Sequence, residues 1–256
     1  MSDDPTPQPR IPESERERDP RSTAPTAKIT MAASPVTVLL FIAPSEVTDA
    51  AQLAATIVRA LAERPNSSLT IDVAEHIPHP LAKLDEDGTP IAMEVSSHTL
   101  LLIVRGRGSA TARAASDLLE AGSDHFDRST SFVIAGEEVV IKPGSGSFSV
   151  VMPVRRLPHF NRPSFQHRWR TIHADFGRRM AAPGYRQVHA AALSDDAGFN
   201  RLVRVNDHDG AAIVSYASLE EMAGTRASPE VARGALDDEL QFVDHARSSL
   251  MLFRSL

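Results

Sequence analysis

Apolar and polar positions alternate along the chain in an order that occurs twice. Residues 36–43 form a short, continuous apolar run, which is typical of a buried strand. The stretch 45–64 follows with apolar residues three and four positions apart, a spacing that predicts a helix packed by one face. Two further strands, a helix over 109–121 and a closing strand up to residue 142 come next. The first half therefore has the predicted order β-α-β-β-α-β.

The same order begins again after the small, polar segment "PGSGS". A strand over 148–156, a helix over 163–180 and a strand over 185–193 are predicted first. A strand at "AAIVSYA", a helical region through "SPEVARGALDDELQFV" and a final strand at "SSLMLFRSL" complete the set. Equivalent strands of the two halves are separated by a nearly constant number of residues. This repetition predicts two tandem domains, 36–145 and 148–256.

A β-α-β-β-α-β unit forms an antiparallel four-stranded sheet with both helices on one face, which leaves the other face uncovered. Two such units can cover each other. We therefore expect an α+β fold in which tandem ferredoxin-like domains close their sheets into an intramolecular, pseudo-dimeric α+β barrel. The alternative is two domains side by side with a different packing. Closure within one chain does not require a second copy, although a homodimer is compatible with it.

Composition narrows the class of protein. Residues 1–30 are rich in proline and mixed charges and contain few large apolar residues, so we expect a disordered tail. The longest apolar run is far shorter than the ~20 residues that a membrane span needs, which argues against a membrane protein. With 27 basic and 33 acidic residues and a net charge of −6, no basic footprint for nucleic acid is present. The absence of cysteine excludes disulfides and favours a reducing cytoplasm.

The helix predicted over 163–180 combines aromatic residues with two histidines. His167 groups with polar neighbours and is expected on the surface, whereas His173 falls on the apolar face. That face is formed by residues at three- and four-residue steps, namely Phe165, Trp169, Ile172, His173, Phe176 and Met180. A core histidine bonded to a backbone carbonyl is the simplest role for His173 on this helix alone.

The following strand changes the interpretation of His173. Its period of two places Tyr185, Gln187 and His189 on one face and Val188 and its small apolar neighbours on the other. The small apolar face suits a tightly packed barrel interior, so the polar face should point toward the helix and lie close to His173. Two histidines, a tyrosine and an amide in an apolar cleft suit proton transfer, because imidazole has an unperturbed pKa of ~6.5.

These residues resemble a known family. The spacing of Phe165, Trp169 and His173, followed by Tyr-x-Gln-x-His, is similar to that of the EthD family of dimeric α+β-barrel proteins. The ending "DDELQFVDH" is similar to that of the family as well. The resemblance covers about 148–256, whereas 36–145 matches only in the order of its elements. It implies that the second half carries the site. The family and its barrel relatives include polyketide-processing enzymes, isomerases, monooxygenases and haem proteins.

Three functions are compatible with this pattern. The first is a cofactor-independent lyase, isomerase or cyclase that acts on a small apolar, aromatic or polyketide-like substrate. In this hypothesis His173, His189 and Tyr185 are catalytic, and the substrate is bound by Trp169, Gln187, Phe165, Phe176 and Tyr216. The second is a haem-binding barrel with His173 as the axial ligand. The third is a non-catalytic accessory or binding protein of a catabolic pathway.

Other motifs indicate no metal or nucleotide site. Gly106 and Gly108 lie between a strand and a helix but lack the third glycine of a dinucleotide-binding turn. The acidic cluster Asp237, Asp238 and Glu239 is interpreted as the solvated face of a helix. His173 and His189 lack a third ligand with zinc-site spacing. We therefore expect no metal and no required cofactor.

Overall fold

The computed structural model describes residues 34–45, 50–62, 69–78, 83, 89–94, 96, 98–193, 198–205, 208–224 and 229–256. The tail expected at residues 1–30 lies outside them. The first half contains, in chain order, β1 (Pro35–Ile42), α1 (Ala50–Ala62), β2 (Thr70–His76), β3 (Leu100–Arg107), α2 (Gly108–Ala121) and β4 (Phe132–Lys142). These elements follow the predicted order.

The second half repeats this order with a more elaborate first helix. Its main elements are β5 (Phe148–Val154), α3 (Arg162–Arg168), the π-helical turn η2 (Trp169–His173), α4 (Ala174–Arg179), β6 (Gly184–Ala190), β8 (Gly210–Tyr216), α5 (Leu219–Gly224), α6 (Pro229–Glu239) and β9 (Met251–Ser255). Shorter elements are η4 (Phe199–Arg201), β7 (Arg204–Val205) and η5 (His245–Arg247). Of the helices described, none has the length and apolar character needed to cross a membrane.

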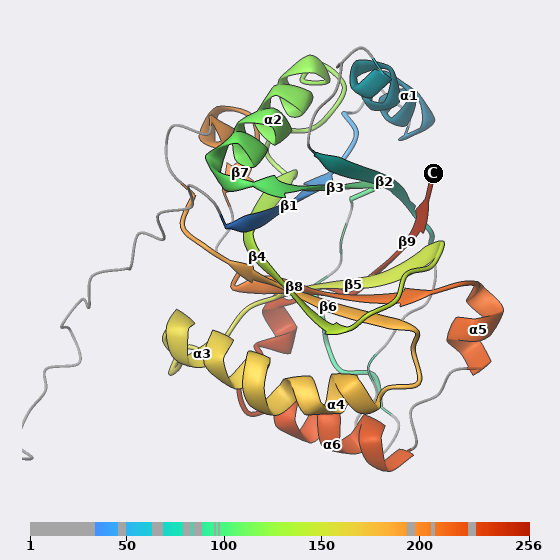
Figure 1. Cartoon of the computed structure of the whole chain (residues 1–256), viewed down its shortest axis with the longest axis vertical. Helices are drawn as coiled ribbons and strands as arrows, with labels where there is room; N and C mark the ends of the chain where they lie inside the picture. The colour runs from blue at the N-terminus through green and yellow to red at the C-terminus, as the bar shows by residue number, and fades with distance from the viewer. Residues whose placement is uncertain are drawn as a thin grey trace, which may run out of the picture.

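The strands close into a barrel. The first half contributes the neighbours β4-β1-β3-β2, and the second half contributes β6-β8-β5-β9. Antiparallel pairing of β4 with β6 and of β2 with β9 joins the halves. Helices α1 and α2 lie on one outer side, and α3, α4 and α6 lie on the opposite side (Figure 1). The predicted α+β barrel of two ferredoxin-like units is confirmed, whereas the domain bounds 36–145 and 148–256 stay a prediction.

Strands of the barrel are buried on both faces. On β1, Val38 and Leu40 pack in the layer beneath α1 and α2, and Leu39 and Phe41 point into the barrel. Burial on both sides accounts for the continuous apolar run of this strand. On β6, Val188 belongs to the barrel interior, as the alternation of the sequence predicts.

The first helix of the second half departs from the predicted regular helix. Asn161 begins it, with its side-chain oxygen accepting a hydrogen bond from the Ser164 amide at 2.8 Å. The π-helical turn then widens the helix, because its hydrogen bonds span five residues instead of four. Trp169 and His173 are both buried by this turn. The expectation that Ile172 shares their face is wrong, since Ile172 is 50% exposed.

Candidate functional site

A chain of hydrogen bonds runs along the helix-facing side of β6. The side-chain nitrogen of Gln187 donates to the Trp169 carbonyl at 3.2 Å and to the Tyr185 hydroxyl at 3.0 Å. The side-chain oxygen of Gln187 lies 2.9 Å from Nε2 of His189. All three β6 residues are buried. The structure therefore brings together Tyr185, Gln187 and His189 on the face predicted from the alternation.

This chain determines which nitrogen of His189 carries the proton. The Gln187 amide nitrogen faces a carbonyl, so the amide oxygen is the atom turned toward His189. An amide oxygen only accepts, so Nε2 of His189 is the donor and, in the neutral ring, Nδ1 holds the lone pair. That Nδ1 is buried and has no hydrogen-bond partner among the described residues. A buried acceptor without a partner costs about 1–3 kcal/mol, which a ligand that donates to it would recover.

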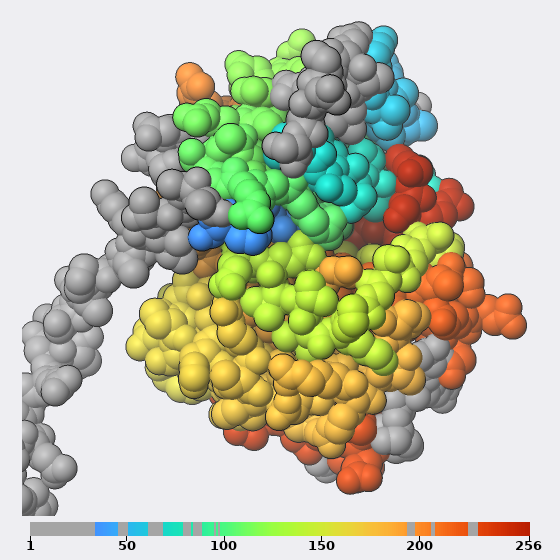
Figure 2. Space-filling view, in the orientation of Figure 1, coloured from blue at the N-terminus to red at the C-terminus, as the bar shows by residue number. Residues whose placement is uncertain are grey.

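The single tryptophan of the chain covers this imidazole. The rings of Trp169 and His189 have centroids 4.8 Å apart. Gly210 on β8 permits the approach, because a Cβ at this position would lie 2.6 Å from the Trp169 ring and 2.2 Å from the Val188 carbonyl oxygen. Figure 2 shows α3, η2 and α4 as a continuous yellow-to-amber layer over this side of the molecule. The imidazole is therefore closed off from solvent.

Burial keeps His189 and Tyr185, the two titratable groups in this chain of hydrogen bonds, uncharged. Loss of hydration lowers the pKa of His189 to about 3, with a smaller contribution from the nearby charge of Arg170. Burial raises the pKa of Tyr185, and hydrogen bonds from Gln187 and Trp169 only partly oppose this. At neutral pH the site therefore offers a neutral imidazole with an acceptor at Nδ1 and a neutral phenol.

The lowered pKa of His189 predicts a specific loss of stability in acid. The folded-state pKa of about 3 lies below the unfolded value of ~6.5, so the unfolded chain binds the proton first. Stability is complete above the unfolded value and falls as the pH drops toward 3. Between pH 7 and pH 4 the wild type should lose ~3 kcal/mol more than the His189→Gln variant. Urea unfolding followed by Trp169 fluorescence measures this, and equal pH slopes for both proteins would contradict it.

His173 has different partners. Its Nδ1 lies 3.0 Å from a carboxylate oxygen of Asp238, and its Nε2 lies 3.4 Å from one of Glu239. Arg168 pairs with the same Asp238. The interpretation of the acidic cluster as a solvated face is therefore wrong for Asp238 and Glu239, and only Asp237 is exposed. Contacts between α6 and α4 turn these two carboxylates inward.

The two carboxylates are held in their charged form. Burial by itself raises the pKa of Glu239, but the charges of Lys83 and His173 and hydrogen bonds from His245 and Lys83 outweigh it and lower the pKa. The His245 bond, from Nε2, is 3.0 Å long. For Asp238, hydrogen bonds from His173 and Arg168 likewise outweigh burial and lower the pKa. His173 thus belongs to an ionic cluster that joins η2 to α6.

Aromatic rings connect the hydrogen-bonded residues of β6 with the ionic cluster that contains His173. From Trp169, ring contacts lead to Phe165 at 5.7 Å, on to Phe242 at 5.3 Å and to His173 at 5.5 Å. Among the described residues, no hydrogen bond or ring contact joins His173 directly to His189. The expected closeness of His173 to the β6 residues stays a prediction.

The remaining candidates lie at the edges of the region. Phe176 is half-buried beside His173, with ring centroids 5.9 Å apart. The exposed position expected for His167 is confirmed. Tyr216 is buried at the end of β8, and burial raises its pKa. No described hydrogen bond or ring contact joins Tyr216 to Tyr185, Gln187 or His189.

The described residues do not fit a haem whose axial ligand is His173. Its iron needs a histidine, methionine, cysteine or tyrosine side chain facing the space that holds the porphyrin. His173, the expected ligand, directs both nitrogens to carboxylates. The residues that line the cavity inside the barrel include no side chain of these four types. Nor do the described residues contain a group of three or more His, Asp or Glu arranged to hold a metal.

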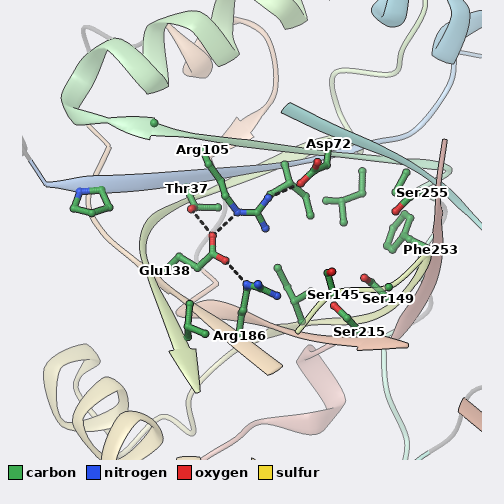
Figure 3. A pocket seen from close by; sticks show the side chains of 18 of the residues that line it. Thr37, Asp72, Arg105, Glu138, Ser145, Ser149, Arg186, Ser215, Phe253 and Ser255 are labelled. Atoms are coloured by element: carbon green, nitrogen blue, oxygen red, sulfur yellow. Dashed lines mark hydrogen bonds and ion pairs between the residues drawn. The ribbon is translucent and has the colours of Figure 1, made fainter. Parts of the chain in front are cut away.

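The barrel interior contains a cavity that the sequence did not predict. Small apolar residues on β6 indicated a tightly packed interior, but one end holds a cavity of about 550 Å³. Arg105, Glu138 and Arg186 lie at this end (Figure 3). A signal was present in the alternation of β4, where Glu138 follows Phe132 and Ile134 on the inward-facing positions. This signal was missed because polar residues at the end of a predicted strand usually lie in solvent.

Residues 157–246, which include the helix and β6 of this site, match the model of the EthD domain. This match lies entirely within the second half of the chain. No curated protein shows significant sequence similarity to the chain. Among solved structures, an anthrone oxidase-like protein is 10% identical, covers 89% of this chain and 94% of that chain, and has a TM-score of 0.55.

Two further solved structures are similar to this chain in fold. A proposed monooxygenase from Lactobacillus acidophilus is 10% identical, covers 87% of this chain and 94% of that chain, and has a TM-score of 0.51. A proposed chlorite dismutase is 11% identical with the same coverages and a TM-score of 0.50. At these identities the similarity concerns the fold alone, and it extends over most of the chain, including much of the half that the EthD match does not reach.

Proposed function

We propose that the EthD half is a cofactor-independent lyase or isomerase that moves a proton on a small aromatic or polyketide-like molecule. The observation that carries the proposal is the buried Nδ1 of His189, an acceptor whose tautomer is set and whose hydrogen-bonding capacity is unused. Trp169 and Phe165 supply the apolar walls that such a substrate requires.

In the proposed reaction, Nδ1 of His189 takes a proton from a substrate carbon that is bonded to a carbonyl or is joined to one through an aromatic ring. The electrons of the broken C–H bond move onto the carbonyl oxygen, which gives an enolate. Nε2–H stays bonded to Gln187, and Tyr185 holds the other side of the same amide, so the imidazole keeps its orientation. Return of the proton to another atom completes an isomerisation, and loss of a leaving group completes an elimination.

The low pKa of His189 applies to the site in which Trp169 covers the imidazole. Burial is its main cause, and a negative charge that develops on the substrate beside the ring favours the protonated form and raises the pKa. Entry of a substrate requires movement of Trp169. The π-helical turn that carries Trp169 and His173 supports this, because such turns occur frequently at functional sites. We assign His173 a positioning role through its bonds to Asp238 and Glu239.

Anthrone is a suitable probe, because one structurally similar protein is anthrone oxidase-like. Anthrone also enolises by loss of a proton from the methylene carbon opposite the carbonyl in its central ring, with the electrons passing to the carbonyl oxygen through the fused aromatic rings. The protein is expected to accelerate hydrogen–deuterium exchange at the anthrone methylene carbon in D₂O, with saturation in anthrone, as followed by NMR. Exchange no faster than with free imidazole at equal concentration would contradict the catalytic proposal. Saturable binding without exchange would instead assign a non-catalytic binding protein.

A further inference from the structure

The interior of the barrel differs between its two ends. At one end the inward-facing side chains are large and apolar, with Phe41 and Phe132 stacked at 4.5 Å. Toward the other end, Leu101, Ile213 and Phe253 form the apolar part of the cavity wall. The polar side chains that line the same cavity are Thr37, Asp72, Arg105, Glu138, Arg186, Ser145, Ser149, Ser215 and Ser255 (Figure 3). The cavity is therefore amphipathic.

Glu138 is at the centre of the polar end. Its Oε2 accepts hydrogen bonds from Thr37 at 2.8 Å and from Nε of Arg105 at 2.7 Å. Its Oε1 pairs with Nε of Arg186 at 3.0 Å. The Glu138 side chain is only 10% exposed, so these three donors replace most of its hydration. The carboxylate is thus satisfied by the protein and holds two guanidinium groups in place.

Arg105 and Arg186 each have N–H groups that these bonds to Glu138 do not use. Arg105 also pairs with Asp72, and Nη1 of Arg186 donates to the Gly144 carbonyl at 2.6 Å. The Nη2 atoms of Arg105 and Arg186 have no hydrogen bond to any residue that the structure describes. Arg105 comes from the first half and Arg186 from the second, and both side chains line the same cavity (Figure 3). Barrel closure therefore places two guanidinium groups, together with the carboxylates of Asp72 and Glu138 that pair with them, beside a partly apolar cavity.

The ionic group is costly as a structural element. The Glu138 carboxylate has lost most of its hydration, which ion pairing seldom repays in full, whereas the opposite end of the barrel is filled by apolar residues. The volume of about 550 Å³ lies within the range of pockets that hold small organic ligands. A ligand with an anionic group would engage the unused guanidinium donors in bidentate or paired hydrogen bonds.

We propose that the barrel cavity is a second binding site, for a small organic carboxylate with an apolar body of one or two rings. The carboxylate lies against Arg105 and Arg186, and the rings pack on the apolar wall. The site does not depend on the proton-transfer proposal, because the two use opposite faces of β6, with Arg186 inside the barrel and Gln187 outside it.

The test compares 2-naphthoate with its neutral analogue 2-naphthalenemethanol on the full chain by isothermal titration calorimetry at pH 7.5. The wild type is expected to bind one equivalent of 2-naphthoate at least about 10-fold more tightly than the alcohol, the factor expected for hydrogen bonds to charged groups. The Arg105→Gln, Arg186→Gln double variant should lose this preference. The comparison of the two ligands on the wild type needs no variant and so remains informative if the double variant does not fold.

His189→Gln is the matched control and should bind 2-naphthoate as the wild type does. Equal affinity for acid and alcohol, no saturable binding of 2-naphthoate, or an unchanged preference in the folded double variant would each overturn the proposal. Loss of naphthoate binding in His189→Gln would also overturn it, because it would place the ligand at the helix-covered site. Failure of anthrone exchange has no bearing on these outcomes.

Discussion

Replacement of His189 by glutamine is expected to slow protein-catalysed hydrogen exchange of anthrone by about 10²- to 10⁴-fold, the usual contribution of a general base. Glutamine can place an amide nitrogen near Nε2 and keep the hydrogen bond to Gln187, but it lacks the basic Nδ1. The change therefore removes the base with little disturbance of the chain that orients it. NMR of anthrone in D₂O measures the rate, and circular dichroism verifies the fold.

Two other histidines serve as controls for this experiment. His167→Gln, at an exposed position of the same helix, should leave the exchange rate unchanged. His173→Gln should lower stability and change the rate, while the pH dependence of the remaining activity keeps its wild-type form, since His189 remains the base. Wild-type rates in His189→Gln would refute the assignment, and a loss confined to His173→Gln with a changed pH profile would identify His173 as the base.

Replacement of Glu239 by glutamine is expected to lower the free energy of unfolding by about 3–5 kcal/mol at pH 7, because it leaves a buried ionic cluster without its central charge. Lys83, His173 and His245 all contact this carboxylate. The lowered pKa of Glu239 sets the pH dependence. Its stabilisation is complete above the unfolded value of ~4.3 and is lost as the pH falls below it.

Denaturation in urea at several pH values measures both parts of this prediction. The difference between wild type and Glu239→Gln should be full at pH 7 and should shrink below about pH 4. Asp237→Asn is the matched control, because Asp237 lies two positions away on the exposed side of the same helix and should change stability little. A deficit in Glu239→Gln that is independent of pH would show that shape, not charge, is responsible.

The periodicity of the sequence was sufficient for the fold and for the orientation of β6. Runs such as 36–43 are apolar at every position because both faces of the strand are buried, and the alternation in β6 separates Val188 from Gln187 and His189. These are local signals, since each depends on neighbours within a few residues. The repeated order of elements extends them to the closed barrel, because two ferredoxin-like sheets have one uncovered face each.

Only the tertiary structure decided how the polar groups are paired. Asp238 and Glu239 are turned inward by the packing of α6 on α4, which a helix taken alone does not reveal. The π-helical turn exposes Ile172 although its spacing is that of a buried residue. Arg105, Glu138 and Arg186 come from three strands that meet only when the barrel closes. Pairing between distant elements depends on the three-dimensional register of the sheet, and periodicity along one segment carries no information about it.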